Sequence, residues 1–263
     1  MTISRIGIIG VGVMGEALIA ALLRSGITPS SIVIREKRAD RSAEMTEKYS
    51  VATGSISGCD AVFLLVKPQD LVATLQELRS EISSDALVVS FIAGKSTATI
   101  ESLLQPSQRV IRVMPNTPMT LGKGFAAMSK GAHATSDDLF WLEQALSSSS
   151  AVITIPESDQ DAITALSGSG PAYFFLMVEA MAEAGNNLGL NQDDALKAAK
   201  EVLIGAAALV EKSGKDPKTL RENVTSTNGT THAALTTFSN EGFREIVYRA
   251  MKAAQERSIE LSQ

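Results

Sequence analysis

Three glycines near the N-terminus have the spacing Gly10-x-Gly12-x-x-Gly15 and could form a phosphate-binding turn. They follow the apolar run Ile6–Ile9 and lead into an amphipathic segment. In such a strand–turn–helix unit the glycines allow a tight turn, close approach of a pyrophosphate, and close helix packing, while free helix N–H groups attract the anion. The motif predicts a dinucleotide site, with a glycine-rich turn lacking a ligand as the alternative. The residues expected to bind the cofactor are Gly10, Val11, Gly12, Val13, Met14 and Gly15.

The charged residues Arg35-Glu36-Lys37-Arg38 follow a second apolar run, Ile32–Ile34, and bear on the choice of cofactor. In dinucleotide-binding folds an acid at this place binds the ribose hydroxyls of NAD, whereas a nearby arginine suits the 2′-phosphate of NADP. Three cations around one acid favour NADPH, with Arg35 and Lys37 as its contacts and NADH as a further cofactor. The same residues could also be solvated charges at a helix entrance.

Two further segments follow apolar runs at places where a parallel sheet opens toward a ligand. The first is Val66-Lys67-Pro68, whose three residues we expect to contact the cofactor. Lys67 would neutralise a cofactor phosphate. The second is Met114–Pro118, whose two prolines would fix a rigid loop, and whose Asn116 offers a carboxamide where a nicotinamide would sit. A surface lysine and a stiff turn are the plain alternatives.

These segments need a framework that brings them together. From Ile3 to about Ile155, short apolar runs alternate with amphipathic stretches. This pattern is typical of an α/β fold with a doubly wound parallel sheet of the Rossmann type and right-handed crossovers. Strands are predicted at residues 6–9, 32–34, 61–66, 87–89 and 110–113, and helices at 16–25, 38–49, 69–82 and 97–104.

After Pro156 the strand pattern ends and only helical patterns follow. We therefore predict a dinucleotide-binding domain over residues 1–156 and an all-α substrate and dimerisation domain over residues 157–263. Seven consecutive apolar residues, Ala172–Val178, give more apolar surface than a small helical domain can cover. A second copy of the chain is the expected cover, and a central helix in a monomeric bundle is the alternative.

The composition argues against several classes of function. The chain has 263 residues and a net charge of −5 without a block of basic residues, so nucleic acid is not an expected partner. One cysteine, Cys59, and two distant histidines provide neither an internal disulfide nor a common metal site. The apolar runs are far shorter than the ~20 residues that cross a bilayer. We expect a cytoplasmic protein with no metal and no membrane partner.

Two later motifs, Ser167–Tyr173 (SGSGPAY) and Val224–Thr231 (VTSTNGTT), are more specific than the glycine motif. Together with the three N-terminal motifs, and in this order, they make the chain resemble pyrroline-5-carboxylate reductases. The resemblance covers about residues 6–256. It implies hydride transfer from NAD(P)H to the C=N bond of 1-pyrroline-5-carboxylate, which gives L-proline. It also implies a helical domain that intertwines in a homodimer, with a decamer of dimers as the larger assembly.

The resemblance also implies a substrate site. Backbone N–H groups of Gly229, Thr230 and Thr231 open a predicted helix and could bind the substrate carboxylate. Thr231 is the best hydroxyl to assist at the ring nitrogen and is the expected catalytic residue. An N-cap without a ligand is the alternative. Further substrate contacts are expected from Asn223, Ser226 and the acid Glu157, which would favour a protonated imine.

The chain departs from the family at Thr227-Asn228, where the family has Pro-Gly. Asn tolerates left-handed backbone angles, so Asn228 could preserve the turn, although loss of the proline leaves it less rigid. Two other interpretations remain from the sequence. One is a related two-domain reductase of imines or β-hydroxyacids acting on another small acid. The other is a non-enzymatic NADP-binding regulator.

Overall fold

The computed structural model describes residues 3–262 and divides the chain into two compact units. The first unit runs to Ser169 and also includes the chain from Ala254 onward, and the second is Gly170–Ala253. The predicted boundary after residue 156 lies within the first unit. Residues just after this boundary pack against the sheet: the Gln160 side chain is buried and donates a hydrogen bond to the Ala127 carbonyl at 3.2 Å.

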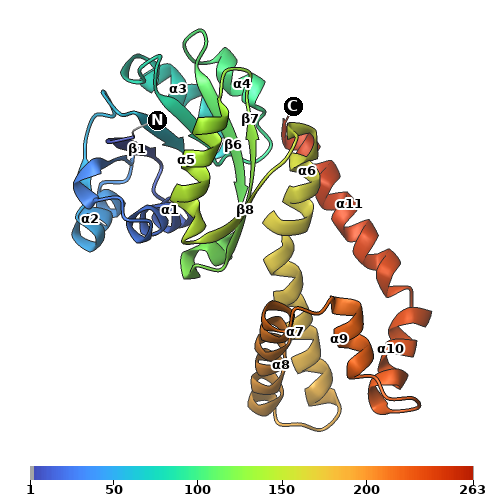
Figure 1. The fold of residues 1–263 in the computed structure, drawn as a ribbon. Coiled ribbons are helices and arrows are strands. Elements are labelled where there is room, and N and C mark those ends of the chain that lie inside the picture. Colours follow the sequence, from blue (N-terminus) through green and yellow to red (C-terminus); the bar gives the residue numbers. More distant parts are fainter. Residues whose placement is uncertain (1–2, 263) are drawn as a thin grey trace. The chain divides into compact units, whose positions relative to one another are not determined.

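Eight strands of the first unit form one sheet, in which every neighbouring pair is parallel except β6 and β7. The chain builds the sheet outward from β1 in one direction and from β4 in the other (Figure 1). Ligands of such sheets bind at this switch point, outside the carboxyl ends of the strands. The predicted doubly wound sheet is confirmed. In spatial order the strands are β3 (Ala52–Thr53), β2 (Ile32–Arg35), β1 (Ile6–Ile9), β4 (Ala61–Leu64), β5 (Leu87–Ser90), β6 (Arg109–Pro115), β7 (Gly124–Lys130) and β8 (Ser150–Thr154).

Helices cover both faces of this sheet (Figure 1). One face is covered by α1, α2 and α5, which bury residues such as Leu18, Met45 and Leu142. The other is covered by α3 and α4, through residues such as Leu75 and Ile100. The central strands are buried on both sides, which explains their continuous apolar sequences. The bounds are α1 (Val13–Arg24), α2 (Ala39–Tyr49), α3 (Leu71–Leu78), α4 (Thr97–Ser102) and α5 (Ser136–Ser147).

The elements β3, β7, α5 and β8 are absent from the predicted set. The sequence of β7, Gly124–Lys130, consists mainly of small residues and contains no β-branched run, so its pattern is weak. Its position comes from pairing instead, since β7 runs antiparallel to β6 and parallel to β8.

The second unit is entirely helical, as predicted. Its helices α7 and α8 pack through small residues: a Cβ added to Gly185 would lie 3.1 Å from the Cβ of Ala195, and Ala199 is buried. None of the described helices has the length and hydropathy needed to span a membrane. The helices after β8 are α6 (Gln160–Ile163), a π-helical turn (Thr164–Gly168), α7 (Gly170–Asn187), α8 (Gln192–Lys212), α9 (Pro217–Asn223), α10 (Thr230–Asn240) and α11 (Phe243–Ser262), the last of which enters the first unit at Ala254.

Candidate functional site

The glycine-rich loop joins the ends of three adjacent strands. Gly10 has φ +90°, and a Cβ there would lie 3.0 Å from the Leu65 carbonyl oxygen just beyond β4. Its N–H donates to the Arg35 carbonyl at the end of β2 at 3.0 Å. The structure thus brings the loop together with the backbone of Arg35 and with Val66, whose nitrogen would be 3.3 Å from the same Cβ.

The other two glycines of the motif differ in their surroundings. A Cβ on Gly15 would overlap the carbonyl oxygen of Gly10, so α1 can approach the loop only with glycine at this position. A Cβ on Gly12 would meet no described atom within 4 Å. Gly12 is also the N-cap of α1 and has no side chain to bond the first amides of the helix. The loop therefore offers open space and free N–H groups, which fit a pyrophosphate.

The Val11 peptide at the centre of this loop is held at both ends by side chains. Its N–H donates to Glu36 Oε2 at 2.8 Å, and its carbonyl oxygen accepts from Arg41 Nε at 2.8 Å. Arg41 on α2 also pairs with Glu16 and, at 2.7 Å, with Glu44. The sequence analysis missed Arg41, because only its spatial position beside the loop distinguishes it from other charged residues of α2.

Glu16 lies in the first turn of α1, where a negative charge would oppose a bound anion. Lys48 donates to it at 2.8 Å, and Arg41 and Tyr49 donate as well. These hydrogen bonds lower the pKa of the Glu16 carboxyl to about 2, and the bond from Lys48 has the largest effect. The two cations therefore neutralise the acid nearest to the helix start.

The basic residues after β2 are less available than the sequence suggested. Arg35 pairs with Glu77 at 3.4 Å, and Arg38 pairs with Asp40 at 2.5 Å. Lys37 is exposed. Beyond β4, Lys67 is also exposed, and Pro68 opens the short helical turn that its sequence position predicts.

Asn116 is engaged by the protein itself. Its Nδ2 lies 3.3 Å from the carbonyl oxygen of Ser167 and 3.2 Å from its Oγ, and its Oδ1 accepts from the Phe125 N–H at 2.9 Å. The carboxamide thus joins the loop after β6 to β7 and to the π-helical turn. Its predicted contact with a cofactor stays a prediction.

Glu157 has similar structural partners. Its carboxylate accepts from the N–H of Thr97 at 2.7 Å and from its Oγ1 at 2.6 Å, and it lies 3.6 Å from Arg112. Arg112 is only 5% exposed and also lies 3.5 Å from Asp161. These contacts anchor the segment after β8 to the sheet. They leave the predicted substrate contact of Glu157 without support in the described contacts.

In the second unit, the turn before α10 has the backbone that the sequence predicts. Asn228 adopts the left-handed conformation with φ +60°, which confirms that asparagine can replace glycine here. The Gly229 N–H donates to the Ser226 carbonyl at 3.0 Å and is therefore used within the turn. Gly229 caps α10 without a side-chain bond, which leaves the first helical amides, those of Thr230 and Thr231, to a ligand. Ser226, Thr230 and Asn223 are exposed, and Thr231 is half-buried.

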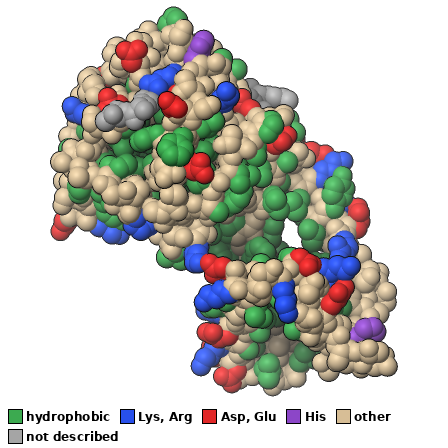
Figure 2. Space-filling model, in the orientation of Figure 1, with side chains coloured by type: hydrophobic (Ala, Val, Ile, Leu, Met, Phe, Trp, Pro, Cys, Tyr) green, Lys and Arg blue, Asp and Glu red, His purple; other side chains and the backbone are tan. Residues whose placement is uncertain are grey.

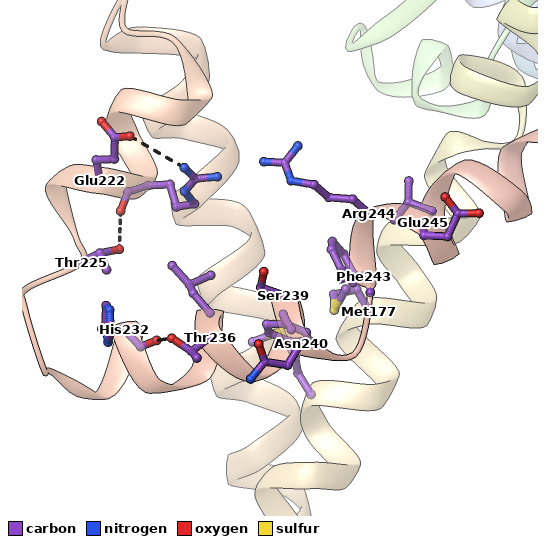
Figure 3. Close-up of a pocket in the computed structure, with 16 residues that line it drawn as sticks. Met177, Glu222, Thr225, His232, Thr236, Ser239, Asn240, Phe243, Arg244 and Glu245 are labelled. Carbon is purple, nitrogen blue, oxygen red and sulfur yellow. Dashed lines mark hydrogen bonds and ion pairs between the residues drawn. The ribbon is translucent and has the colours of Figure 1, made fainter.

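Beside this turn lies a cavity of about 1310 Å³ (Figure 3). It is bounded by α7, α9, α10 and the first turns of α11, and Met177, Phe238 and Phe243 give it apolar walls. His232 and Thr236 of α10 also line it. Apolar side chains are exposed along the helices of this unit (Figure 2), among them Phe174, Phe175, Leu176, Ile204 and Tyr248. Within residues 3–262, no three His, Cys, Asp or Glu side chains are grouped so as to hold a metal ion.

Comparisons with known proteins match both parts of the chain. Residues 157–261 match the family model described as pyrroline-5-carboxylate reductase dimerisation, and residues 5–94 match that of NADP oxidoreductase, coenzyme F420-dependent. The pyrroline-5-carboxylate reductase of Corynebacterium melassecola is 39% identical, over 98% of both chains, and that of Pseudomonas aeruginosa is 35% identical, over 100% of this chain and 98% of the other. Among solved structures, the Coxiella burnetii pyrroline-5-carboxylate reductase aligns over 100% of both chains with a TM-score of 0.92 and 32% identity. A Plasmodium falciparum pyrroline carboxylate reductase solved with NADP bound aligns over 98% of both with a TM-score of 0.86 and 25% identity.

Proposed function

The chain belongs to the pyrroline-5-carboxylate reductase family, and from this premise we propose which of its residues carry out the reaction. The enzyme reduces 1-pyrroline-5-carboxylate to L-proline with NAD(P)H, the last step of proline biosynthesis. The full-length similarity to reductases of this one name favours this reaction over a different small acid and over a non-enzymatic regulator.

The cofactor supplies the hydride, so the protein needs to bind, orient and balance charge rather than provide a nucleophile. In our proposal the first-turn amides of α1 and the open backbone at Gly12 hold the pyrophosphate. Lys67 neutralises one of its charges, and Val66 and Pro68 form the adjacent wall. The bonds from Glu36 and Arg41 to the Val11 peptide support this role, because they fix the loop before the cofactor arrives.

The substrate carboxylate binds at the start of α10, where the amides of Thr230 and Thr231 and the positive end of the helix dipole act together. Asn223 and Ser226 add polar contacts at the rim. The hydroxyl of Thr231 lies at the ring nitrogen of the substrate. It helps to deliver the proton that this nitrogen carries in the product. The observation that supports this proposal is the glycine cap: Gly229 has no side-chain oxygen to bond the first amides of the helix.

We further propose that the working form is a homodimer. The enzyme is a homo-oligomer, because its helical part matches the dimerisation domain of the family. Pockets for drug-sized ligands have volumes of about 300–1,000 Å³, so the cavity of about 1310 Å³ is larger than a five-membered ring with one carboxylate requires. Apolar helices of a second subunit would cover it together with the exposed faces of Phe174 and Phe175. Nothing described here supports a decamer. A cytoplasmic location stays a prediction from the composition.

Assays of cofactor oxidation with pyrroline-5-carboxylate, other cyclic imines and ketoacids test the proposal. Thr230→Pro removes the Thr230 amide at the first position of α10, where a helix tolerates proline, and should raise KM about tenfold with little change in kcat, because it weakens only binding of a charged group. Thr231→Val should instead lower kcat and alter its pH profile, whereas Thr231→Ser should keep most of the activity. Thr237→Val, on the same helix but away from its start, is the matched control. Unchanged kinetics for both Thr230→Pro and Thr231→Val would contradict the proposed site.

A further inference from the structure

Glu36 occupies a specific place beside the glycine-rich loop. The parallel register pairs Ile9 of β1 with Arg35 of β2, so the next residues along the two strands are Gly10 and Glu36. Glu36 is half-buried, and its carboxylate accepts from the Val11 N–H at 2.8 Å and from the Arg38 N–H at 3.0 Å. Each oxygen accepts one hydrogen bond and retains a further lone pair. The carboxylate is therefore fixed at the loop and can still accept from a ligand hydroxyl.

The surrounding cations have partners of their own. Arg35 pairs with Glu77 on α3, and Arg38 pairs with the exposed Asp40. Arg41 donates a hydrogen bond to the loop, and all three of its guanidinium nitrogens are engaged: with the Val11 carbonyl, with Glu44 and with Glu16. Only Lys37, among the four basic residues of the segment 35–41, has no acidic partner among the described residues. Lys37 is exposed, whereas the Glu36 carboxylate is hydrogen-bonded to the loop itself, so the group fixed beside the loop at the end of β2 is an acid.

We infer that Glu36 makes this reductase prefer NADH to NADPH, by accepting hydrogen bonds from the adenosine ribose hydroxyls and repelling a 2′-phosphate. An acid at the end of β2 has this role in NAD-binding sheets, and juxtaposed like charges are strongly unfavourable. The inference rests on the proposal that residues 10–15 hold the pyrophosphate. It concerns preference alone: NADPH remains a cofactor, used with a lower kcat/KM. It differs from the expectation of NADPH that the cations of the sequence suggest, and the match of residues 5–94 to an NADP oxidoreductase model agrees with NADPH as a cofactor.

The test compares kcat/KM for NADH and NADPH, and the Kd of each cofactor by fluorescence titration, in the wild-type enzyme and in Glu36→Gln. Glutamine keeps the length of the side chain and an oxygen for the Val11 N–H but removes the charge. We expect the wild type to favour NADH, and the NADH/NADPH ratio of Glu36→Gln to move toward NADPH by about tenfold or more. A structural role of Glu36 alone would weaken both cofactors equally and leave the ratio unchanged.

Two controls separate the charge at this position from other effects. Glu47→Gln removes one exposed charge from α2, and its ratio should match that of the wild type. The double variant Arg35→Ala/Lys37→Ala tests the opposite assignment, in which cations bind the 2′-phosphate, and its ratio should change less than that of Glu36→Gln.

Several outcomes would overturn the inference. These are a wild-type preference for NADPH, a ratio in Glu36→Gln within about twofold of wild type, or a larger change in the double variant. Gly12→Val tests the proposed pyrophosphate site separately from the cofactor preference. Its side chain enters the open space at the loop and should weaken binding of both cofactors while the enzyme stays folded. If Gly12→Val binds both as tightly as wild type, the proposed pyrophosphate site fails as well.

Discussion

The glycine-rich loop of the first unit and the Ser226–Thr231 turn of the second unit both lead into a helix capped by glycine. Neither cap has a side chain that could bond the first helix amides, whereas Ser96, Thr135 and Asn191 cap α4, α5 and α8 with their side chains. In both places the first helix amides have no side-chain cap, an arrangement that suits an anion. The two turns therefore share one backbone feature, a glycine N-cap that leaves the first helix amides without a side-chain partner.

They differ in how they are supported. In the first unit the Val11 peptide is held by Glu36 and Arg41, and Val11 itself is fully buried. In the second unit the turn has mainly backbone bonds, and the helices around it expose apolar side chains. In our proposal the first turn is complete within one chain, and the second is completed by a covering partner subunit. Preorganisation would then have two sources, a hydrogen-bond network and an assembly.

The largest effect is expected from adding a methyl group at Gly15. In Gly15→Ala the new Cβ would overlap the Gly10 carbonyl, so the loop must shift. We expect a loss of ~3 kcal/mol in unfolding free energy and about 100-fold weaker cofactor binding. Gly12→Ala is the matched control: it should bind cofactor more weakly but unfold within ~0.5 kcal/mol of wild type. Thermal unfolding and fluorescence titration measure the two, and a fully stable Gly15→Ala would contradict the rigid first turn.

A charge on α7 should test whether the second turn depends on a partner. Phe175 is 59% exposed, and Phe175→Asp would place a carboxylate in the proposed subunit interface. We expect the Kd of the dimer to rise about 30-fold or more, with activity falling in parallel. Sedimentation velocity and kcat at matched concentrations measure this. Phe140→Asp, at a 63% exposed residue of α5 in the first unit, should change neither. If Phe175→Asp forms a fully active dimer as tightly as wild type, the proposed dependence of the Ser226–Thr231 turn on a partner subunit is wrong.

Low pH should reduce the stability of the first unit, because it protonates Glu16 beside the glycine-rich loop. Its pKa is lowered from 4.5 to about 2, so its contribution to stability is complete above about pH 4.5 and is lost as the pH falls toward 2. Glu16→Gln should be less stable than wild type by about 1–2 kcal/mol at pH 6, with the difference shrinking below pH 4.5. Urea unfolding from pH 6 to 3 measures it. A difference that stays constant over this range would show that the charge of Glu16 is unimportant to the fold.

The smallest effect is expected at the second turn itself. Asn228→Ala replaces a residue suited to φ +60° by one that is not, at a cost of about 1 kcal/mol. Because a turn that is less populated binds substrate less well, KM for pyrroline-5-carboxylate should rise about fivefold. Asn228→Gly should leave KM near the wild-type value. Equal KM values for the alanine and glycine variants would mean that the partner subunit alone shapes this turn.

Much of the fold could be predicted because it depends on local pattern. Strands β1, β2 and β5 are buried runs with clear ends, and α1, α2 and α4 lie within a few residues of their predicted positions. Strand β7 escaped because small residues give no periodic signal, and its position depends on pairing with β6 and β8. The match to the dimerisation family model begins at residue 157, where the predicted second domain begins. The compact units divide later, after Ser169, since Gln160 and Glu157 join the sheet through side-chain contacts that no local pattern records.

The sequence by itself indicated the chemistry that the chain can perform: the glycine spacing and the left-handed Asn228 follow from short-range rules of backbone geometry, and the later motifs resemble those of one family of reductases. Tertiary structure decided what each charged or polar side chain does there. It joined Asn116 to Ser167, bound Arg35 to Glu77 and fixed Glu36 on the Val11 amide. The physical reason is that a side chain's role depends on which groups fold against it, and those groups are tens of residues away along the chain.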